Sequence, residues 1–321
     1  MTGTGKIAVL GDGAWGTVMA LMLCSSGHEV RLWGHDADYL DAMRRTRLNQ
    51  LFLPDFELPE ALDFDADLAR AVDWAELVVS AVPSKFLRAV YDGGHRYYPG
   101  AKPIVSLTKG LEPETFRRPS EIIRELLGAE HVAALSGPSH AEEVAQGLPA
   151  SVVVASHELE IARLIQHAVS TPRFRAYASR DLVGVEIAGA AKNVIALAAG
   201  VATGMDLGNN ALSALITRGL AETARLGAML GGEQQTFAGL AGMGDLITTC
   251  YSPYGRNRQV GMRLAEGETL EEILADIPGV PEGVSTTDSL LALAVRHDAA
   301  MPITEQVAAI LWEGKDPETA L

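Results

Sequence analysis

The fold is decided near the N-terminus, where Ile7-Ala8-Val9-Leu10 is followed by Gly11-Asp12-Gly13-Ala14-Trp15-Gly16. The first four residues form an uninterrupted apolar run, as in a strand that is buried on both faces. The next six residues fit the pattern G-x-G-x-x-G and open a small, apolar helical segment. In such a unit the first glycine makes a tight turn, the second lets backbone approach a pyrophosphate, and the third permits close helix–strand packing. The stretch therefore predicts a dinucleotide site with Gly11, Gly13 and Gly16 against the cofactor.

Further apolar runs continue the same alternation of strand and helix. We expect strands at Glu29–Trp33, Leu77–Val82, Ile104–Leu107 and Val132–Leu135, with 151–155 and 174–178 as extensions of the sheet. Continuous apolar strands separated by helices indicate a parallel sheet with both faces covered. The first half of the chain is thus predicted to be a Rossmann-like, doubly wound α/β sheet.

Beyond Asp181 the strand-like runs disappear and Ala/Leu-rich helical segments replace them. Helices are expected at 211–230, 270–275, 287–296 and 303–312. We therefore expect two domains: residues 1–187 as an NAD(P)-binding Rossmann-like domain, and residues 188–321 as an all-helical substrate and catalytic domain.

Composition narrows the class of protein further. The chain has 26 Lys and Arg against 41 Asp and Glu, a net charge of −15, so it has no global attraction for nucleic acid or an anionic membrane. Its 2 cysteines, Cys24 and Cys250, exclude a disulfide framework and fit a reducing compartment. Met1–Lys6 lead directly into the first strand, and no uncharged apolar run approaches the ~20 residues that span a bilayer. The scattered histidines lack paired ligand spacing, so we expect no metal site. With the cysteine count and the lack of a long apolar run, we expect a cytoplasmic protein without membrane insertion.

The residues after the second predicted strand bear on the choice of coenzyme. An NAD-preferring site usually has an acid at the end of this strand, whereas the sequence here is Trp33-Gly34-His35-Asp36, in which Asp36 comes late. A 2′-phosphate would meet His35, with Arg44, Arg45 and Arg47 further along, although these arginines equally fit a solvated helix face. Both NADP(H) and NAD(H) therefore remain open.

Four segments place a lone charge among glycine and apolar residues. Lys109 follows a predicted strand, at the sheet edge where doubly wound folds bind ligands. Lys192 interrupts a helix of Ala, Val and Ile, where an ammonium is costly unless it faces a cleft with a partner. Asp245 lies in a glycine turn, and Arg256-Asn257 supply a guanidinium and an amide that suit a phosphate.

Together these segments resemble the NAD(P)-dependent glycerol-3-phosphate dehydrogenase family, the bacterial type in particular. The matching stretches run in the family's order over essentially the whole chain: GDGAWGT at 11–17, WGHD at 33–36, VPS at 82–84, SLTKGLE at 106–112, SGPSHAEEVAQGLP at 136–149, GAAKNVIALAAG at 189–200, NALSALITRGLAE at 210–222, LAGMGDLITTC at 240–250, GRNR at 255–258, EGV at 282–284 and MPITE at 301–305.

The resemblance implies reversible reduction of dihydroxyacetone phosphate to sn-glycerol 3-phosphate for phospholipid synthesis, with Lys192 in proton transfer. It implies that Lys109 contacts both substrate and nicotinamide. The substrate contacts that it implies are Lys109, Gly137, Ser139, Lys192, Asp245, Gly255, Arg256 and Asn257, with Asn193 and Thr249 as weaker candidates. The cofactor contacts are Ala14, Trp15, His35, Lys109, Ala141, Arg256, Val280 and Glu282, beside the three glycines.

One position departs from the family pattern. Many bacterial members have serine before the Arg-Asn pair, whereas this chain has Gly255, which leaves only a backbone N–H there for the phosphate. Two rival functions remain: a hydroxy-acid or sugar-acid dehydrogenase of the same architecture, and a non-catalytic NADPH-binding sensor. The apolar helices at 211–230 and 303–312 are expected to cover each other or a second subunit, the latter giving a homodimer.

Overall fold

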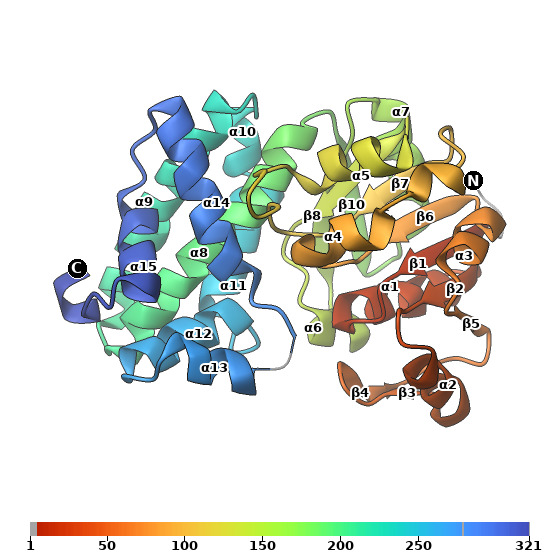
Figure 1. The fold of residues 1–321 in the computed structure, drawn as a ribbon, viewed down its shortest axis with the longest axis horizontal. Coiled ribbons are helices and arrows are strands. Elements are labelled where there is room, and N and C mark those ends of the chain that lie inside the picture. The colour runs from red at the N-terminus through yellow and green to blue at the C-terminus, as the bar shows by residue number, and fades with distance from the viewer. Residues whose placement is uncertain (1–4, 278, 321) are drawn as a thin grey trace. The chain divides into compact units, whose positions relative to one another are not determined.

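The computed structural model describes residues 5–277 and 279–320, so Met1–Thr4, Pro278 and Leu321 lie outside the described residues. Within them the chain forms two compact units, whose residues can be found in Figure 1 by the colour, which follows residue number. The sheet unit comprises residues 5–108, 119–135 and 139–182, and the helical unit comprises residues 109–118, 136–138, 183–277 and 279–320. The boundary near residue 187 between a Rossmann-like and an all-helical domain stays a prediction.

The sheet unit contains a doubly wound sheet of eight strands in the order β10-β9-β8-β7-β6-β1-β2-β5. Each strand pair with an assigned register is parallel, as in Ile7 opposite Val30 and Ile7 opposite Leu77. The order reverses between β1 and β6, and a crevice beyond the carboxyl ends of the strands at such a point is where open sheets bind ligands. The strands are β1 (Lys6–Leu10), β2 (Glu29–Trp33), β5 (Leu62–Asp65), β6 (Leu77–Ser80), β7 (Ile104–Ser106), β8 (Val132–Ser136), β9 (Ala150–Ala155) and β10 (Phe174–Ser179).

Helices cover both faces of this sheet because alternate residues of each strand enter different cores. Ile7 and Val9 of β1 share a core with residues of α1 and α7, whereas Ala8 and Leu10 share a core with residues of α3, α4 and α5. The helical elements of this unit are α1 (Ala14–Ser25), α2 (Ala37–Thr46), α3 (Leu68–Trp74), α4 (Ser84–Tyr91), η1 (Gly94–Arg96), α5 (Pro119–Leu127), α6 (Ala141–Ala145) and α7 (Leu159–Val169). The predicted Rossmann-like sheet is confirmed.

Three strands were missed by sequence analysis. The edge strand β5 has the sequence LDFD, and the hairpin of β3 (Leu48–Asn49) and β4 (Leu53–Glu57) is short and partly polar. These segments lack the apolar runs that revealed the central strands, because an edge strand or small hairpin need not be buried on both faces.

The helical unit is built around α8 (Leu182–Gly204), whose residues pack against those of several other helices in one core. Among the described residues α8 is the one helix long and apolar enough to cross a membrane, but 89% of that apolar window is buried inside the protein. Such burial is typical of a core helix. The other elements are α9 (Gly208–Met229), α10 (Gln234–Phe237), η2 (Leu240–Gly244), α11 (Asp245–Tyr251), α12 (Arg256–Ala265), α13 (Leu270–Asp276), α14 (Glu282–His297), α15 (Pro302–Trp312) and η3 (Pro317–Ala320).

A buried carboxylate joins α9 to α15. Glu222 is 2% exposed and accepts hydrogen bonds from Ile303 N at 2.9 Å, Thr304 N at 3.0 Å and Thr304 Oγ1 at 2.6 Å. These donors belong to the first turn of α15, where backbone N–H groups have no partner within the helix and a negative charge is favoured. The two helices therefore cover each other in part within one chain, and a homodimer stays a prediction.

Candidate active site

The glycine turn after β1 has the geometry that a pyrophosphate requires. Gly11 has a φ of +115°, in the region that favours glycine. A Cβ added at Gly16 would lie 1.9 Å from the carbonyl oxygen of Gly11, so α1 packs on the turn only because this residue lacks a side chain. A Cβ added at Gly13 would meet nothing within 4 Å, which leaves open space above the N-terminus of α1. The residues present therefore fit the diphosphate of a dinucleotide, with Ala14 and Trp15 in the first turn of the helix.

Asn49 holds this turn in place, and sequence analysis missed it. Its side-chain amide donates to the carbonyl oxygen of Asp12 at 2.7 Å and to Thr17 Oγ1 at 2.8 Å, while its Oδ1 accepts from Tyr39 Oη at 2.6 Å and Phe52 N at 3.1 Å. Asn49 is fully buried and uses both donors and both acceptor positions of its amide. A lone asparagine 33 positions beyond Gly16 in the sequence gives no local signal of such a contact.

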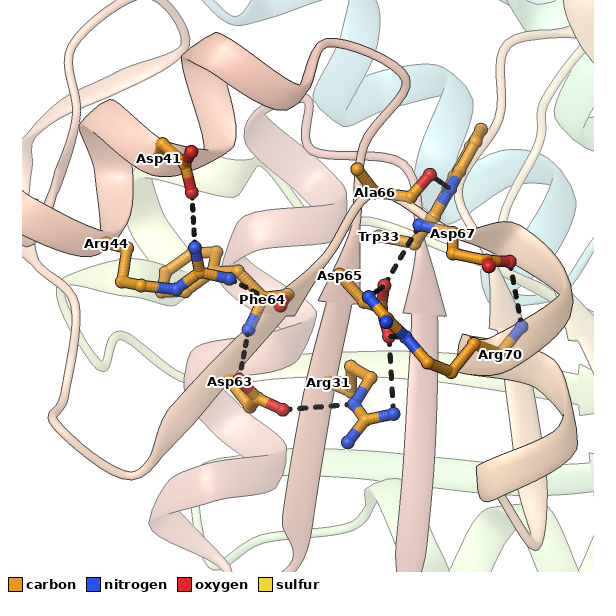
Figure 2. A network of polar contacts seen from close by, with 10 residues as sticks. All are labelled: Arg31, Trp33, Asp41, Arg44, Asp63, Phe64, Asp65, Ala66, Asp67 and Arg70. Atoms are coloured by element: carbon orange, nitrogen blue, oxygen red, sulfur yellow. Dashed lines mark hydrogen bonds and ion pairs between the residues drawn. The ribbon is translucent and has the colours of Figure 1, made fainter.

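The arginines considered for a 2′-phosphate make contacts within the sheet unit, and Figure 2 shows those of Arg44. Arg44 pairs with Asp41 and donates to the carbonyl oxygen of Phe64 at 2.7 Å. Arg47 donates to the carbonyl oxygens of Pro59 and Leu62 at 3.3 and 3.0 Å, and Arg45 Nε donates to that of Asp41 at 3.3 Å. Two of these arginines therefore tie α2 to the segment that leads into and forms β5. His35 is exposed.

In the helical unit, three charged residues that are far apart in the sequence meet. Asp245 Oδ1 accepts from Lys192 Nζ at 2.5 Å, and Asp245 Oδ2 accepts from Lys109 Nζ at 2.7 Å. Lys192 also donates to Thr249 Oγ1 at 2.7 Å, and Lys109 donates to the carbonyl oxygen of Gly137 at 3.0 Å. An ammonium has three N–H donors, so each lysine keeps one beyond these contacts. Two cations and one anion leave this lysine cluster with a net charge of +1.

Small residues allow the lysine cluster to assemble. A Cβ added at Gly189, one turn before Lys192 in α8, would lie 2.8 Å from Ser136 Oγ and 3.6 Å from Cγ of Lys109. The aliphatic chain of Lys109 thus passes over α8 where the helix has no side chain. Asp245 follows the π-helical turn η2, where a Cβ on Gly242 would lie 2.1 Å from the carbonyl oxygen of Phe237. Such turns occur often at functional sites, because they change the direction in which a helix residue points.

Burial and charge set the protonation of the lysine cluster. Burial and the neighbouring Lys109 lower the pKa of Lys192, the Asp245 carboxylate raises it, and the net result is a pKa of about 8. Burial by itself would raise the pKa of Asp245, but the two lysines outweigh it and hold that pKa below its ordinary value. Lys192 is therefore poised to exchange a proton near neutral pH beside a carboxylate that stays ionised.

A second hydrogen-bonded chain links Lys109 to the Arg-Asn pair. Asn193 Nδ2 donates to the carbonyl oxygen of Lys109 at 2.7 Å, and Asn257 Nδ2 donates to Asn193 Oδ1 at 3.0 Å. Asn257 Oδ1 in turn accepts from Gly283 N at 2.9 Å. The Asn257 side chain thus uses its oxygen and one of its two N–H donors within the protein. It can still offer an anion the other side-chain N–H and its backbone N–H in the first turn of α12.

Arg256 and Gly255 lie at the same helix N-terminus. Gly255 is the N-cap of α12, and Arg256 is its first residue. A Cβ at Gly255 would lie 3.1 Å from the carbonyl oxygen of Thr249, so the serine usual in the family would be tightly packed here. The Arg256 guanidinium lies against Gly279, where a Cβ would come within 2.3 Å of Nη1.

The remaining expected contacts are divided between the two units. Ser139 and Ala141 belong to the sheet unit, and Gly137, Val280 and Glu282 belong to the helical unit. Gly137 has a φ of 141°. The Trp15 indole packs on Phe174, with ring centroids 6.1 Å apart, and its buried Nε1 has no hydrogen-bond partner among residues 5–277 and 279–320.

A dinucleotide turn on a doubly wound sheet and a buried lysine with a pKa lowered to about 8 are typical of an NAD(P)-dependent oxidoreductase. The models of the N-terminus and the C-terminus of NAD-dependent glycerol-3-phosphate dehydrogenase match residues 6–162 and 181–321. The chain therefore belongs to the NAD(P)-dependent glycerol-3-phosphate dehydrogenase family.

Individual relatives agree with this assignment. The chain is 48% identical over 319 residues to glycerol-3-phosphate dehydrogenase [NAD(P)+] of Streptomyces coelicolor, and the aligned region covers 98% of this chain and 95% of the relative. It is 46% identical over 319 residues to the enzyme of that name from Geobacter sp. strain M21, with the same coverage. The crystal structure of glycerol-3-phosphate dehydrogenase from Coxiella burnetii superposes with a TM-score of 0.95 at 39% identity, over 99% of this chain and 97% of that one.

Proposed function

We propose that this chain reduces dihydroxyacetone phosphate reversibly to sn-glycerol 3-phosphate, with Lys192 as the proton donor. The observation that carries the proposal is the Asp245 carboxylate, which Lys192 and Lys109 share at 2.5 and 2.7 Å. A ketone that gains a hydride at carbon develops negative charge on oxygen, and nearby N–H donors stabilise that charge before protonating it. NAD(P)H supplies the hydride when bound.

Each residue of the lysine cluster then has a distinct role. Lys192 directs its remaining N–H to the ketone oxygen and transfers that proton as the alcohol forms. Lys109 keeps the site cationic, which helps to lower the pKa of Lys192 and stabilises the oxygen as its charge grows. Asp245 orients both ammonium groups and limits how far the pKa of Lys192 falls. In the reverse direction neutral Lys192 accepts the hydroxyl proton.

The substrate phosphate is assigned to the N-terminus of α12. Its backbone N–H groups and the Arg256 guanidinium suit a dianion, since a guanidinium can form two parallel hydrogen bonds to phosphate oxygens. Binding energy from this end fixes the ketone against the lysines. We assign Gly137, Ser139, Gly255 and Asn257 to substrate contacts, and Gly11, Gly13, Ala14, Trp15, Gly16, His35, Ala141, Val280 and Glu282 to the coenzyme, with Lys109 and Arg256 touching both.

The proposed setting is the cytoplasm, where the product would supply the backbone of phospholipids, with a homodimer as the assembly. The reducing compartment inferred from two free cysteines supports the location. Neither part of this setting affects the chemistry above.

Steady-state kinetics with dihydroxyacetone phosphate and both coenzymes test the function. We expect turnover by the native chain and a loss of about 10²-fold or more in kcat for Lys192→Ala, the usual contribution of a general acid. Lys315→Ala, a substitution near the C-terminus and outside the lysine cluster, is the control and should keep native turnover. Native kcat in a folded Lys192→Ala protein would remove this lysine from the mechanism, and preference for unphosphorylated keto acids would replace the substrate.

A further inference from the structure

The end of β2 has no acidic side chain of its own, but a carboxylate from the glycine turn occupies the space there. β2 ends at Trp33, and the next residue is Gly34. A Cβ added at Gly34 would lie 2.5 Å from Oδ2 of Asp12 and 2.8 Å from its Cγ. The Asp12 side chain, from the first x of the G-x-G-x-x-G turn, therefore lies over the position from which NAD-binding proteins usually present their acid.

This carboxylate is poorly satisfied by the protein. Burial raises the pKa of Asp12, while its own backbone N–H and the neighbouring His35 act in the opposite direction. No side chain among residues 5–277 and 279–320 donates a hydrogen bond to it. A partly buried carboxylate without side-chain donors is costly, and hydroxyl groups of a bound ligand would relieve that cost.

The surroundings offer little to a 2′-phosphate. The guanidinium groups of Arg44 and Arg47 are bound to carbonyl oxygens or to Asp41, and that of Arg45 makes one contact, to the carbonyl oxygen of Asp41. Those of Arg31 and Arg70 are paired with Asp63 and Asp65 (Figure 2). Asp36 adds a further negative charge close enough to raise the pKa of Asp12. His35 remains as the neighbouring group that becomes a cation on protonation. A phosphate dianion placed here would face a carboxylate at short range.

We propose that Asp12 selects the coenzyme: its carboxylate accepts a hydrogen bond from the 2′-hydroxyl of the adenosine ribose and repels a 2′-phosphate, so that this chain prefers NADH to NADPH. The inference rests on the coenzyme site proposed above and refines it. Asn49 supports the geometry, because its bond to the Asp12 carbonyl oxygen fixes the backbone from which the carboxylate extends.

The test compares kcat/KM for NADH and NADPH in the native chain and in Asp12→Asn, which keeps the shape and removes the charge. We expect a native preference for NADH that falls about tenfold or more in Asp12→Asn, because the amide oxygen can still accept from the 2′-hydroxyl but lacks the charge that strengthens this bond and repels a 2′-phosphate. Asp38→Asn removes the same charge from an exposed position in the first turn of α2 and should leave the preference unchanged. In Asp36→Asn the amide keeps the N-cap bond to Tyr39 N, so this variant tests the neighbouring acid.

Calorimetric binding of 5′-AMP and 2′,5′-ADP separates this inference from the proposed reaction, since neither probe needs turnover. If the native chain binds 5′-AMP more tightly than 2′,5′-ADP and Asp12→Asn loses this difference, the inference is supported even if dihydroxyacetone phosphate is not reduced. A native preference for NADPH would overturn the inference, as would an unaltered preference in a folded Asp12→Asn protein or a switch produced by Asp36→Asn alone.

Discussion

Replacing Asp245 by asparagine removes the anion that two buried ammonium groups share while keeping the shape of the side chain. At contact distances of 2.5 and 2.7 Å, and at an effective dielectric constant of about 20, each ion pair has a Coulomb energy of roughly 6 kcal/mol before desolvation is counted. A shift of one pKa unit corresponds to about 1.4 kcal/mol, which is about a quarter of the Coulomb energy of one such ion pair. The pKa of Lys192, held at about 8 in the native chain, should therefore fall by about one unit or more in Asp245→Asn.

The consequence is a shift in the pH profile. Lys192 must be protonated to reduce the ketone, so native kcat/KM for reduction should decline as the pH rises through about 8. In Asp245→Asn the decline should occur near pH 7 or below, and protonation alone then costs about fivefold in rate at pH 8. The reverse oxidation needs neutral Lys192, so its rate should rise over the same range, and the shift should appear there too.

The assay is kcat/KM against pH in both directions, with folding checked by circular dichroism. The matched control is Asp276→Asn, which removes an exposed carboxylate paired with Arg263 in the same unit. An Asp245→Asn protein that is folded and active, yet retains the native decline near pH 8, would refute the assignment of that titration to Lys192.

Three further substitutions test the rest of the site. Gly16→Ala should lower the thermal stability and weaken coenzyme binding, because its Cβ would lie 1.9 Å from the carbonyl oxygen of Gly11; overpacking of this kind costs about 1–3 kcal/mol, measured by urea unfolding. Gly13→Ala should leave the melting temperature unchanged and still raise KM for the coenzyme, since its Cβ would enter the open space assigned to the pyrophosphate; unchanged KM would place the pyrophosphate elsewhere. Arg256→Ala should raise KM for dihydroxyacetone phosphate about tenfold or more, as expected for a lost charge-assisted contact, and leave KM for unphosphorylated dihydroxyacetone unchanged. Equal increases in KM for both ketones would contradict the phosphate assignment.

The sequence alone determined the central sheet, the dinucleotide turn and the family. Each of these is written in neighbouring residues: apolar runs of strand length, and glycines at fixed spacing that serve steric needs of the backbone. The lysines stood out for a similarly local reason, because an ammonium within an apolar helix needs a partner. Asp245 was expected to orient or charge-balance Lys192, and the two residues form an ion pair across 53 positions of sequence. That Asp245 also pairs with Lys109, 136 positions away, was not predicted.

Tertiary structure decided the contacts that no local pattern encodes. Sequence analysis left the arginines at α2 open to a coenzyme phosphate, whereas packing against the segment before and within β5 gave Arg44 and Arg47 carbonyl partners. It gave no sign that the Asn257 amide also contacts Asn193 and Gly283. It did not identify Asn49, and it read the end of β2 as lacking an acid although Asp12 reaches over it. Hydrogen bonds and ion pairs depend on which side chains the folded chain brings within about 3 Å, and sequence spacing carries that information only within a single helix, strand or turn.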